Sequence, residues 1–270
     1  QKCKGGNGKI LRYLSDNYLY PAKFEDLVYA SQLLQADAIK YGVEHFRRER
    51  GWCMGSIYWQ FNDCWPVASW SSVDSCGRYK ALHYAARKFY APVAMGLFLE
   101  KGKLTVNVSN ETMADFSGSI RLRLCAKDFT VLDEKTAPVA VESLESLDVY
   151  RYKLPRCDAY TTYLYVDLLD ENGQLVQRQV EMQVPCKHFE WEKPTVTAEF
   201  RDVEGGVEIA ISGDTFTKGV MLDFEGFDCV LTDNFFSITD GEPYIVTART
   251  DRSARELQAA LTVKTVYDIR

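Results

Sequence analysis

The chain has 270 residues, of which 46% are hydrophobic and 26% charged. This length allows two or three domains, and the composition is that of a globular protein, which excludes a disordered chain. No apolar stretch is long enough to cross a bilayer, and the chain opens in polar loop residues without the pattern of a signal peptide. We therefore expect no membrane partner.

Charge is distributed unevenly along the chain. The net charge is +5 over residues 1–92, −3 over residues 93–187 and −8 over residues 188–270. Because phosphate binding needs a basic surface, the acidic last segment argues against nucleic acid as a partner. The eight cysteines form no C-x-x-C pair and the three histidines are scattered, so we expect no metal, no cofactor and no disulfide framework.

The first periodic segment predicts a long helix. Apolar residues from Phe24 to Arg50 recur at the spacing of one helix face. Glu25 and Asp26 fall in the first turn, arginines fall in the last, and Gly51 follows, as helix ends favour. Upstream, Gly6-Asn7-Gly8 lacks the spacing and the preceding strand of a nucleotide-binding loop, and is typical of a turn at a barrel face.

A strand and a second helix are expected next. The run from Met54 to Phe61 is short, β-branched and aromatic, and it is bounded by Asn62-Asp63. This pattern predicts a buried strand that ends in a polar loop. Residues 78–90 then show helical spacing, which ends before Pro92. The order helix, strand, loop, helix is that of the closing turns of an α/β barrel.

From residue 93 the hydrophobic period changes to two, which is typical of strands. The first set of expected strands covers residues 103–108, 119–124, 161–168 and 176–184. The second set covers residues 195–200, 207–211, 220–224, 244–250 and 257–265, with Gly205-Gly206 as a hairpin signal. These patterns predict two all-β sandwiches of Ig type.

The residues with the clearest chemistry lie between Gly55 and Trp70, where indoles, amides and one carboxylate follow the expected strand. Indole faces stack on the apolar faces of a pyranose, while Asn and Asp side chains exchange hydrogen bonds with its hydroxyls. Active sites of α/β barrels lie at the carboxyl ends of the strands. The segment therefore predicts a sugar-binding site. The alternative is that its tryptophans belong to a core.

Short motifs lie in a characteristic order around that segment. They are Gln1-Lys2, Gly6-Asn7-Gly8, Phe24-Glu25-Asp26, Tyr29-Ala30-Ser31-Gln32 with Gln35, Glu44-His45 with Arg47-Arg48, the tryptophan run, Ser71-Ser72-Val73-Asp74, Lys80-Ala81-Leu82-His83-Tyr84 and Phe89-Tyr90-Ala91-Pro92. In this order and spacing, residues 1–92 resemble the end of the catalytic barrel of β-mannosidases in glycoside hydrolase family 2.

The resemblance implies a mixed fold. Residues 1–92 would be an α/β fragment of a TIM-type barrel end, followed by two all-β Ig-like sandwiches at residues 93–187 and 188–270. It further implies the C-terminal region of a retaining exo-β-mannosidase that hydrolyses terminal non-reducing β-D-mannosides. The substrate of the full-length enzyme would then be a mannoside or oligosaccharide.

Four substrate-binding residues follow from the same resemblance. Trp59 would close one side of the subsite for the terminal mannose, and Asn62, Asp63 and Trp65 would shape its rim or brace Trp59. A retaining glycosidase needs two carboxyl groups about 5–5.5 Å apart. The resemblance places both catalytic glutamates upstream of this chain. The fragment alone should therefore be inactive, and its truncated barrel segment could self-associate.

Two other functions are compatible with the sequence. The sandwiches could form a carbohydrate-binding module, for which Phe235-Phe236, Tyr150 and Tyr152 would supply aromatic contacts. The last domain could instead have a structural or assembly role, which its acidity alone supports. Fold class does not separate these possibilities, because one fold hosts many functions.

Overall fold

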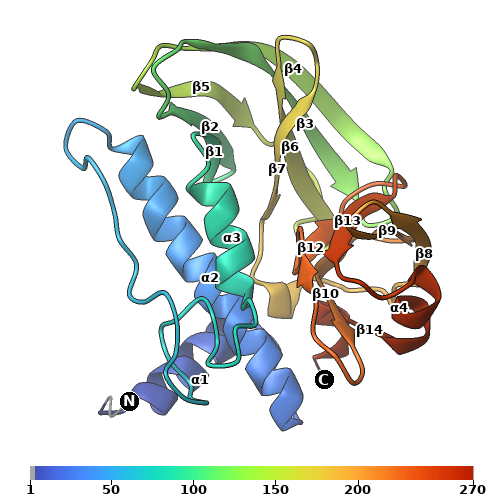
Figure 1. Ribbon diagram of the computed structural model, residues 1–270. Coiled ribbons are helices and arrows are strands. Elements are labelled where there is room, and N and C mark those ends of the chain that lie inside the picture. The colour runs from blue at the N-terminus through green and yellow to red at the C-terminus, as the bar shows by residue number, and fades with distance from the viewer. Residues whose placement is uncertain (1–3, 270) are drawn as a thin grey trace. The chain divides into compact units, whose positions relative to one another are not determined.

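The computed structural model describes residues 4–269, which form two compact units (Figure 1). One unit contains the residues up to 35, residues 59–84 and the residues from 191 onward. The other contains residues 36–58 and 85–190. Gln1 and Lys2, the first motif of the series described above, lie outside the described residues.

Three helices lie in the first third of the chain, and they are α1 (Gly6–Asn17), α2 (Phe24–Arg48) and α3 (Ala81–Phe89). The two predicted helices are confirmed as α2 and α3, with ends that differ by a few residues. The turn expected at Gly6-Asn7-Gly8 is wrong, because these residues begin α1. Helix α1 buries Leu14, and that packing outweighs the weak helix propensity of its first residues. None of the described helices could span a membrane.

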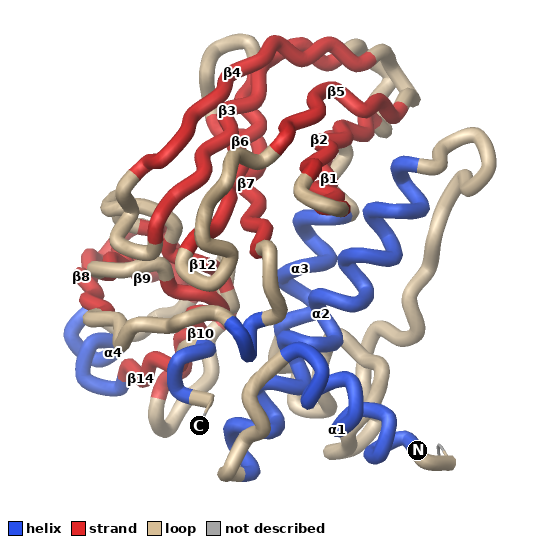
Figure 2. Tube along the Cα trace, turned by 180° about the vertical axis from the view of Figure 1, so that it is seen from behind, coloured by secondary structure: helices blue, strands red, loops and turns tan. Residues whose placement is uncertain are grey.

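The strand predicted from Met54 to Phe61 does not form. The chain between α2 and α3 is a loop (Figure 2), and Ile57 within it is 98% exposed. Among the described residues, this part of the chain has only two isolated bridges, Asn62 to Val73 and Val73 to Tyr79. A barrel strand is held by neighbours on both sides, and none of the strands within residues 4–269 pairs with residues 54–61.

The first sandwich is built from two antiparallel sheets, with strand orders β1-β2-β5 and β4-β3-β6-β7. Its strands are β1 (Val93–Glu100), β2 (Lys103–Asn110), β3 (Phe116–Ala126), β4 (Val131–Val141), β5 (Ser146–Lys153), β6 (Thr162–Asp170) and β7 (Leu175–Met182). The expected Ig-like sandwich is thus confirmed here, although β1, β4 and β5 were not among the four strands predicted from the sequence.

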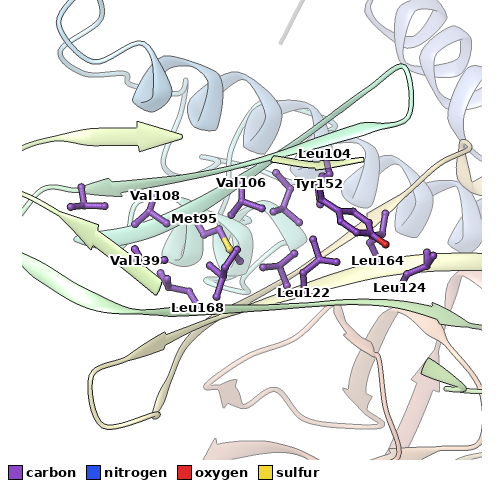
Figure 3. Packing of buried hydrophobic residues seen from close by; sticks show 14 residues of the cluster. Met95, Leu104, Val106, Val108, Leu122, Leu124, Val139, Tyr152, Leu164 and Leu168 are labelled. Carbon is purple, nitrogen blue, oxygen red and sulfur yellow. The ribbon is translucent and has the colours of Figure 1, made fainter. Parts of the chain in front are cut away.

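Alternate residues of these strands meet between the two sheets (Figure 3). The buried cluster includes Leu104, Val106 and Val108 of β2, Ile120, Leu122 and Leu124 of β3, and Leu164, Val166 and Leu168 of β6. Each fully buried side chain of this size contributes about 1.5–3 kcal/mol relative to its exposed state. The period of two seen in the sequence therefore corresponds to the inward face of each strand.

The second sandwich has strand orders β11-β13-β9-β8 and β12-β10-β14. Its strands are β8 (Val196–Val203), β9 (Gly206–Gly213), β10 (Thr217–Phe224), β11 (Val230–Leu231), β12 (Phe236–Ile238), β13 (Tyr244–Arg249) and β14 (Leu261–Lys264). The hairpin predicted at Gly205-Gly206 joins β8 to β9, and Gly205 adopts a φ of 78° there. Short 3-10 helices cover Cys186–His188 and Val266–Asp268.

One strand prediction in this sandwich is wrong in part. Residues 257–265 were expected to form a strand, but α4 (Ala254–Ala260) occupies the first four of them and β14 begins at Leu261. The cause is a capping box, in which the Ser253 side chain accepts from the Glu256 backbone N–H and Glu256 accepts from Ser253. This capping box satisfies backbone N–H groups of the first helical turn, so the chain begins a helix here and not a strand.

Candidate functional site

The polar loop that carries the predicted site is fixed by a buried carboxylate. Asp63 is only 4% exposed, and its Oδ2 accepts hydrogen bonds from Lys80 Nζ at 2.7 Å and from Ser71 Oγ at 2.6 Å. Ser69 Oγ donates to the other carboxylate oxygen. Lys80 Nζ also donates to Ser71 Oγ at 2.7 Å. One ammonium and two hydroxyls therefore satisfy the carboxylate, and they close the loop from residue 63 to residue 71.

The electrostatics of this cluster favour the ionised carboxylate. Burial acts to raise the pKa of Asp63, but the hydrogen bonds from Lys80, Ser69 and Ser71 outweigh it and hold that pKa below its ordinary value of 3.8. The ion pair with Lys80 is itself largely withdrawn from water, since the two side chains are 2% and 14% exposed. Removing one partner of such a pair leaves a buried charge uncompensated.

Backbone hydrogen bonds hold the two ends of the loop side by side. Ser72 N donates to Gln60 O at 3.2 Å and to Phe61 O at 3.1 Å, and Val73 N donates to Phe61 O at 2.9 Å. In the other direction, Asp63 N donates a hydrogen bond to Val73 O at 3.1 Å. Residues 60–63 therefore run parallel to residues 71–73 as a short two-segment ladder.

The indoles carried by this loop face solvent. Trp59 is 71% exposed and Trp65 is 55% exposed, and Trp70 is also exposed. A cis peptide bond joins Trp59 to Gln60. The alternative that these tryptophans form a core does not fit either unit, because buried aromatic rings lose nearly all of their accessible surface. Such rings are available to stack on an apolar ligand face.

The structure separates the four predicted site residues into two kinds. Trp59, Asn62 and Trp65 are exposed, whereas Asp63 is buried with both carboxylate oxygens occupied. The Asn62 side chain makes one local hydrogen bond, from its Nδ2 to Asp63 O at 3.2 Å. Asp63 therefore acts on the loop, which it holds in place, and its geometry does not suit direct contact with a ligand.

Sequence reasoning missed the partners of Asp63. Lys80, Ser69 and Ser71 come 6 to 17 residues after it and were noted only as parts of motifs. One sequence signal could have indicated these partners: a lysine and several serines follow Asp63, which is the lone carboxylate of an otherwise apolar stretch. His83 also contacts the loop. Its Nδ1 shares a hydrogen bond with Ser72 Oγ at 3.1 Å, and burial lowers the pKa of His83 from its ordinary value of 6.5.

Glu44, another buried carboxylate of the first third of the chain, belongs to the other compact unit. Glu44 lies in α2, where Gln179 Nε2 donates to it at 2.7 Å and Lys40 lies 3.8 Å away. Burial raises the pKa of Glu44 above its ordinary value, against the opposing effects of Lys40 and Gln179. Among residues 4–269, no group of three or more His, Cys, Asp or Glu side chains is placed to hold a metal ion.

Comparisons with known proteins identify the sandwiches. Residues 102–188 match the sequence model of a mannosidase Ig/CBM-like domain, and residues 191–269 match that of an Ig-fold domain of mannosidases. β-Mannosidase of Bos taurus is 31% identical over 170 residues, which cover 57% of this chain and 19% of that protein. β-Mannosidase B of Thermothelomyces thermophilus is 26% identical over 276 residues, which cover 89% of this chain and 32% of that protein.

Solved structures give the same result. A crystal structure of a β-D-mannosidase from Dictyoglomus thermophilum matches 97% of this chain and 32% of its own, with a TM-score of 0.89 and 25% identity. An exo-chitosanase from Amycolatopsis orientalis matches 94% of this chain and 35% of its own, with a TM-score of 0.73, and at 18% identity it shows the fold alone.

Together these matches define a chain with two mannosidase-type Ig-like domains. The chain belongs to the β-mannosidase group of glycoside hydrolase family 2, which confirms the resemblance drawn from the sequence motifs. It spans between about a fifth and a third of the length of the two curated relatives described above.

Proposed function

We propose that this chain is the C-terminal region of a retaining exo-β-mannosidase and contributes one wall of the subsite for a terminal β-D-mannoside. The observation that carries the proposal is the loop at residues 59–71, which a buried Asp63–Lys80 ion pair fixes while Trp59 and Trp65 stay exposed. Rigid support beneath exposed indoles is the arrangement that sugar stacking needs, because a preorganised ring loses little entropy on binding.

Each proposed site residue has a distinct role. Trp59 stacks on the apolar face of the terminal mannose, and Trp65 and Asn62 form the rim, where an amide can exchange hydrogen bonds with hydroxyls. Asp63 positions the loop through Lys80, Ser69 and Ser71 and does not contact the sugar. The resemblance of residues 1–92 to family 2 β-mannosidases supports this assignment.

We further propose that residues 1–92 are the end of a catalytic barrel and that the sandwiches occupy residues 93–187 and 188–270. The exposed apolar side chains of Met54, Ile57 and Phe61 support the barrel end, since the preceding strands of a complete barrel would cover and pair with this segment. In this proposal the loop at residues 54–61 becomes a barrel strand in the full-length enzyme.

Catalysis would come from residues outside this chain. Hydrolysis with retention needs a nucleophilic carboxylate and an acid/base carboxyl group about 5–5.5 Å apart. Asp63 is buried, and its partners among the described residues are Lys80, Ser69, Ser71 and the backbone. It therefore lacks the open face that a nucleophile requires. The full-length enzyme would supply two glutamates, and this fragment would supply part of the sugar-binding wall.

The test is a substrate survey with the full-length protein. Aryl β-D-mannoside, β-D-glucosaminide, β-D-galactoside and β-D-glucuronide are compared by kcat/KM. We expect the mannoside to be turned over with the highest kcat/KM and with retention of anomeric configuration. A higher value for any of the other three sugars would reject the mannoside assignment, and an inverted product would reject the retaining mechanism.

The second candidate is carbohydrate binding by the sandwiches, which the description of the model matched by residues 102–188 favours. Calorimetric titration of the chain with β-mannobiose separates the two. Binding that Trp59→Ala abolishes belongs to the loop. Binding that survives Trp59→Ala belongs to another surface of the chain and would support a binding module.

A further inference from the structure

We propose that Phe235 of the second sandwich is a positioning residue for the loop that bears Trp59. The proposal rests on the proposed function, because it assigns to an Ig-like domain the task of holding the sugar-binding wall. Its basis is an unbroken series of ring contacts from Phe235 to Phe61, which lies two residues after Trp59. All members of the series belong to one compact unit.

The series begins at a fixed point in the second sandwich. Asn234 Oδ1 accepts from Leu222 N at 2.8 Å, and Asn234 Nδ2 donates to Leu222 O at 2.9 Å, so the side chain is tied to the backbone of β10. Phe235 N donates to the same Oδ1 at 2.9 Å, and Phe235 adopts a φ of 57°. A phenylalanine rarely adopts this left-handed conformation.

The Phe235 ring contacts two helices. Its centroid lies 6.2 Å from that of Tyr29 in α2 and 6.1 Å from that of Tyr84 in α3. Tyr29 is itself held to the sandwich, because its hydroxyl donates to Gly219 O. Gly219 must be glycine there, since it has a φ of 71° and an added Cβ would lie 2.6 Å from the Tyr29 hydroxyl oxygen.

From Tyr84 the series continues to the loop. Tyr84 meets Tyr79 edge to face at 5.8 Å, Tyr79 lies 4.1 Å from the His83 ring, and His83 meets Phe61 edge to face at 5.9 Å. The Tyr84–Tyr79 and His83–Phe61 separations are within the range in which ring pairs attract beyond simple burial, and the Tyr79 and His83 rings lie closer still. In this proposal, loss of the Phe235 ring weakens the support of Tyr84 and, through Tyr79 and His83, that of Phe61.

Hydrogen bonds join the same rings to the backbone beneath Trp59. His83 Nδ1 is bonded to Ser72 Oγ at 3.1 Å, and Ser72 Oγ donates to Phe61 O at 3.2 Å. The Ser72 backbone N–H donates to Gln60 O and Phe61 O. A shift of His83 would therefore move Ser72, and with it the Gln60 and Phe61 carbonyl groups to which Ser72 donates.

The test compares two neighbouring phenylalanines. Phe235→Leu removes the first ring of the series. Phe236→Leu is the matched control, because Phe236 is buried in the same sandwich but stacks on Tyr244 with centroids 4.1 Å apart. Both are examined in the 270-residue chain by amide hydrogen exchange. We expect Phe235→Leu to speed exchange at Ser72 and Val73 by about 2–10-fold, which corresponds to losing the Phe235–Tyr84 pair on the path to the loop, whereas Phe236→Leu leaves their rates unchanged.

A kinetic measurement on the full-length enzyme links this effect to Trp59. We expect Phe235→Leu to lower kcat/KM for an aryl β-mannoside by about 3–10-fold, mainly through KM, and to have no further effect when Trp59 is already alanine. Phe236→Leu should leave kcat/KM unchanged. Unchanged exchange at Ser72 and Val73 in folded Phe235→Leu, or kinetic effects of Phe235→Leu and Trp59→Ala that simply add, would overturn the proposal.

A second variant covers the case in which Phe235→Leu does not fold, and hydrogen exchange tests the proposal independently of the sugar-binding role of Trp59. If Phe235→Leu does not fold, Tyr84→Leu breaks the same series from the helix side and must give the same exchange pattern at Ser72 and Val73. If Trp59→Ala leaves kcat/KM unchanged, the proposed sugar-binding wall fails. The exchange comparison still decides whether Phe235 positions the loop.

Discussion

Lys80 Nζ lies 2.7 Å from Asp63 Oδ2, and this contact joins two segments that are 17 residues apart in the sequence. The pair fixes the loop that carries Trp59 and Trp65 and is itself largely withdrawn from solvent. A buried pair of this kind is weak evidence for high stability, but breaking it is costly because one charge remains buried. Replacing one residue of this pair should therefore have a large effect on stability, which tests whether the pair holds the loop.

Replacing Lys80 by methionine should destabilise the chain strongly. Asp63 would then be buried without its ammonium, and we expect the free energy of unfolding to fall by about 3–5 kcal/mol. The control is Arg78→Met, which removes the exposed ion pair with Asp228 and should cost less than about 1 kcal/mol. Urea denaturation of both variants measures the difference. Equal losses would show that the Asp63 cluster is not a buried ion pair in solution.

His83 should make stability depend on pH in a defined direction. Its pKa is lowered by burial in the folded chain, so below the unfolded value of 6.5 the unfolded chain binds more protons. The free energy of unfolding therefore decreases as pH falls below 6.5 and approaches the lowered pKa that His83 has in the folded chain.

The measurement compares unfolding at about pH 7.5 and about pH 5.5 for the native chain and His83→Asn. We expect a smaller loss between the two pH values in His83→Asn, and His45→Asn, at an exposed position, serves as the control. Comparing variants at matched pH also cancels the contribution of Glu44, whose raised pKa acts in the opposite direction. The same loss in all three proteins would remove His83 as the cause.

Trp59→Ala should impair the full-length enzyme. We expect the specificity constant for an aryl β-mannoside to fall by an amount equivalent to about 2–4 kcal/mol of transition-state stabilisation, because stacking and ring burial against the sugar are lost together. Trp52→Ala is the control, since Trp52 is 94% exposed and lies outside the loop held by Asp63. Folding is checked by circular dichroism, and a folded Trp59→Ala enzyme with native kinetics would place Trp59 outside the site.

The 270-residue chain alone should not hydrolyse aryl β-mannosides, because the required pair of carboxyl groups is missing. The assay is chromophore release at high protein concentration, with Asp63→Asn measured in parallel. Activity that survives purification and disappears in Asp63→Asn would show that Asp63 is a reactive group and contradict its assignment as a loop anchor.

Local sequence signals account for the parts of the fold that could be predicted. Helix α2 combines an apolar face with acidic residues in its first turn, and the sandwich strands alternate inward and outward residues. Both signals depend on neighbours close in sequence. The wrong strand prediction that began at Leu257 could have been avoided from local sequence as well. Ser253 and Glu256 have the spacing of a capping box, which predicts the start of α4.

Features that depend on distant parts of the chain could not be predicted in the same way. The apolar run at residues 54–61 has the composition of a strand, but a strand forms only where partners supply its hydrogen bonds. The anchoring of Asp63 by Lys80 likewise appears only when the chain folds. Trp59 and Trp65 are exposed, and their role in sugar binding stays a prediction that rests on residue chemistry and not on the exact backbone.

The apolar surface of the loop between α2 and α3 should make the isolated chain self-associate. Trp52, Ile57 and Phe61 are exposed on a loop that belongs to no sheet, and burying such side chains against a second copy removes apolar area from water. We expect light scattering to show concentration-dependent dimers or larger species, together with binding of an apolar dye. Ile57→Glu should reduce both signals, whereas Leu175→Glu, at an exposed position in β7, should leave them unchanged. A strict monomer without dye binding would show that this segment is covered in solution, and the proposal that residues 1–92 are an incomplete barrel end would lose its main physical support.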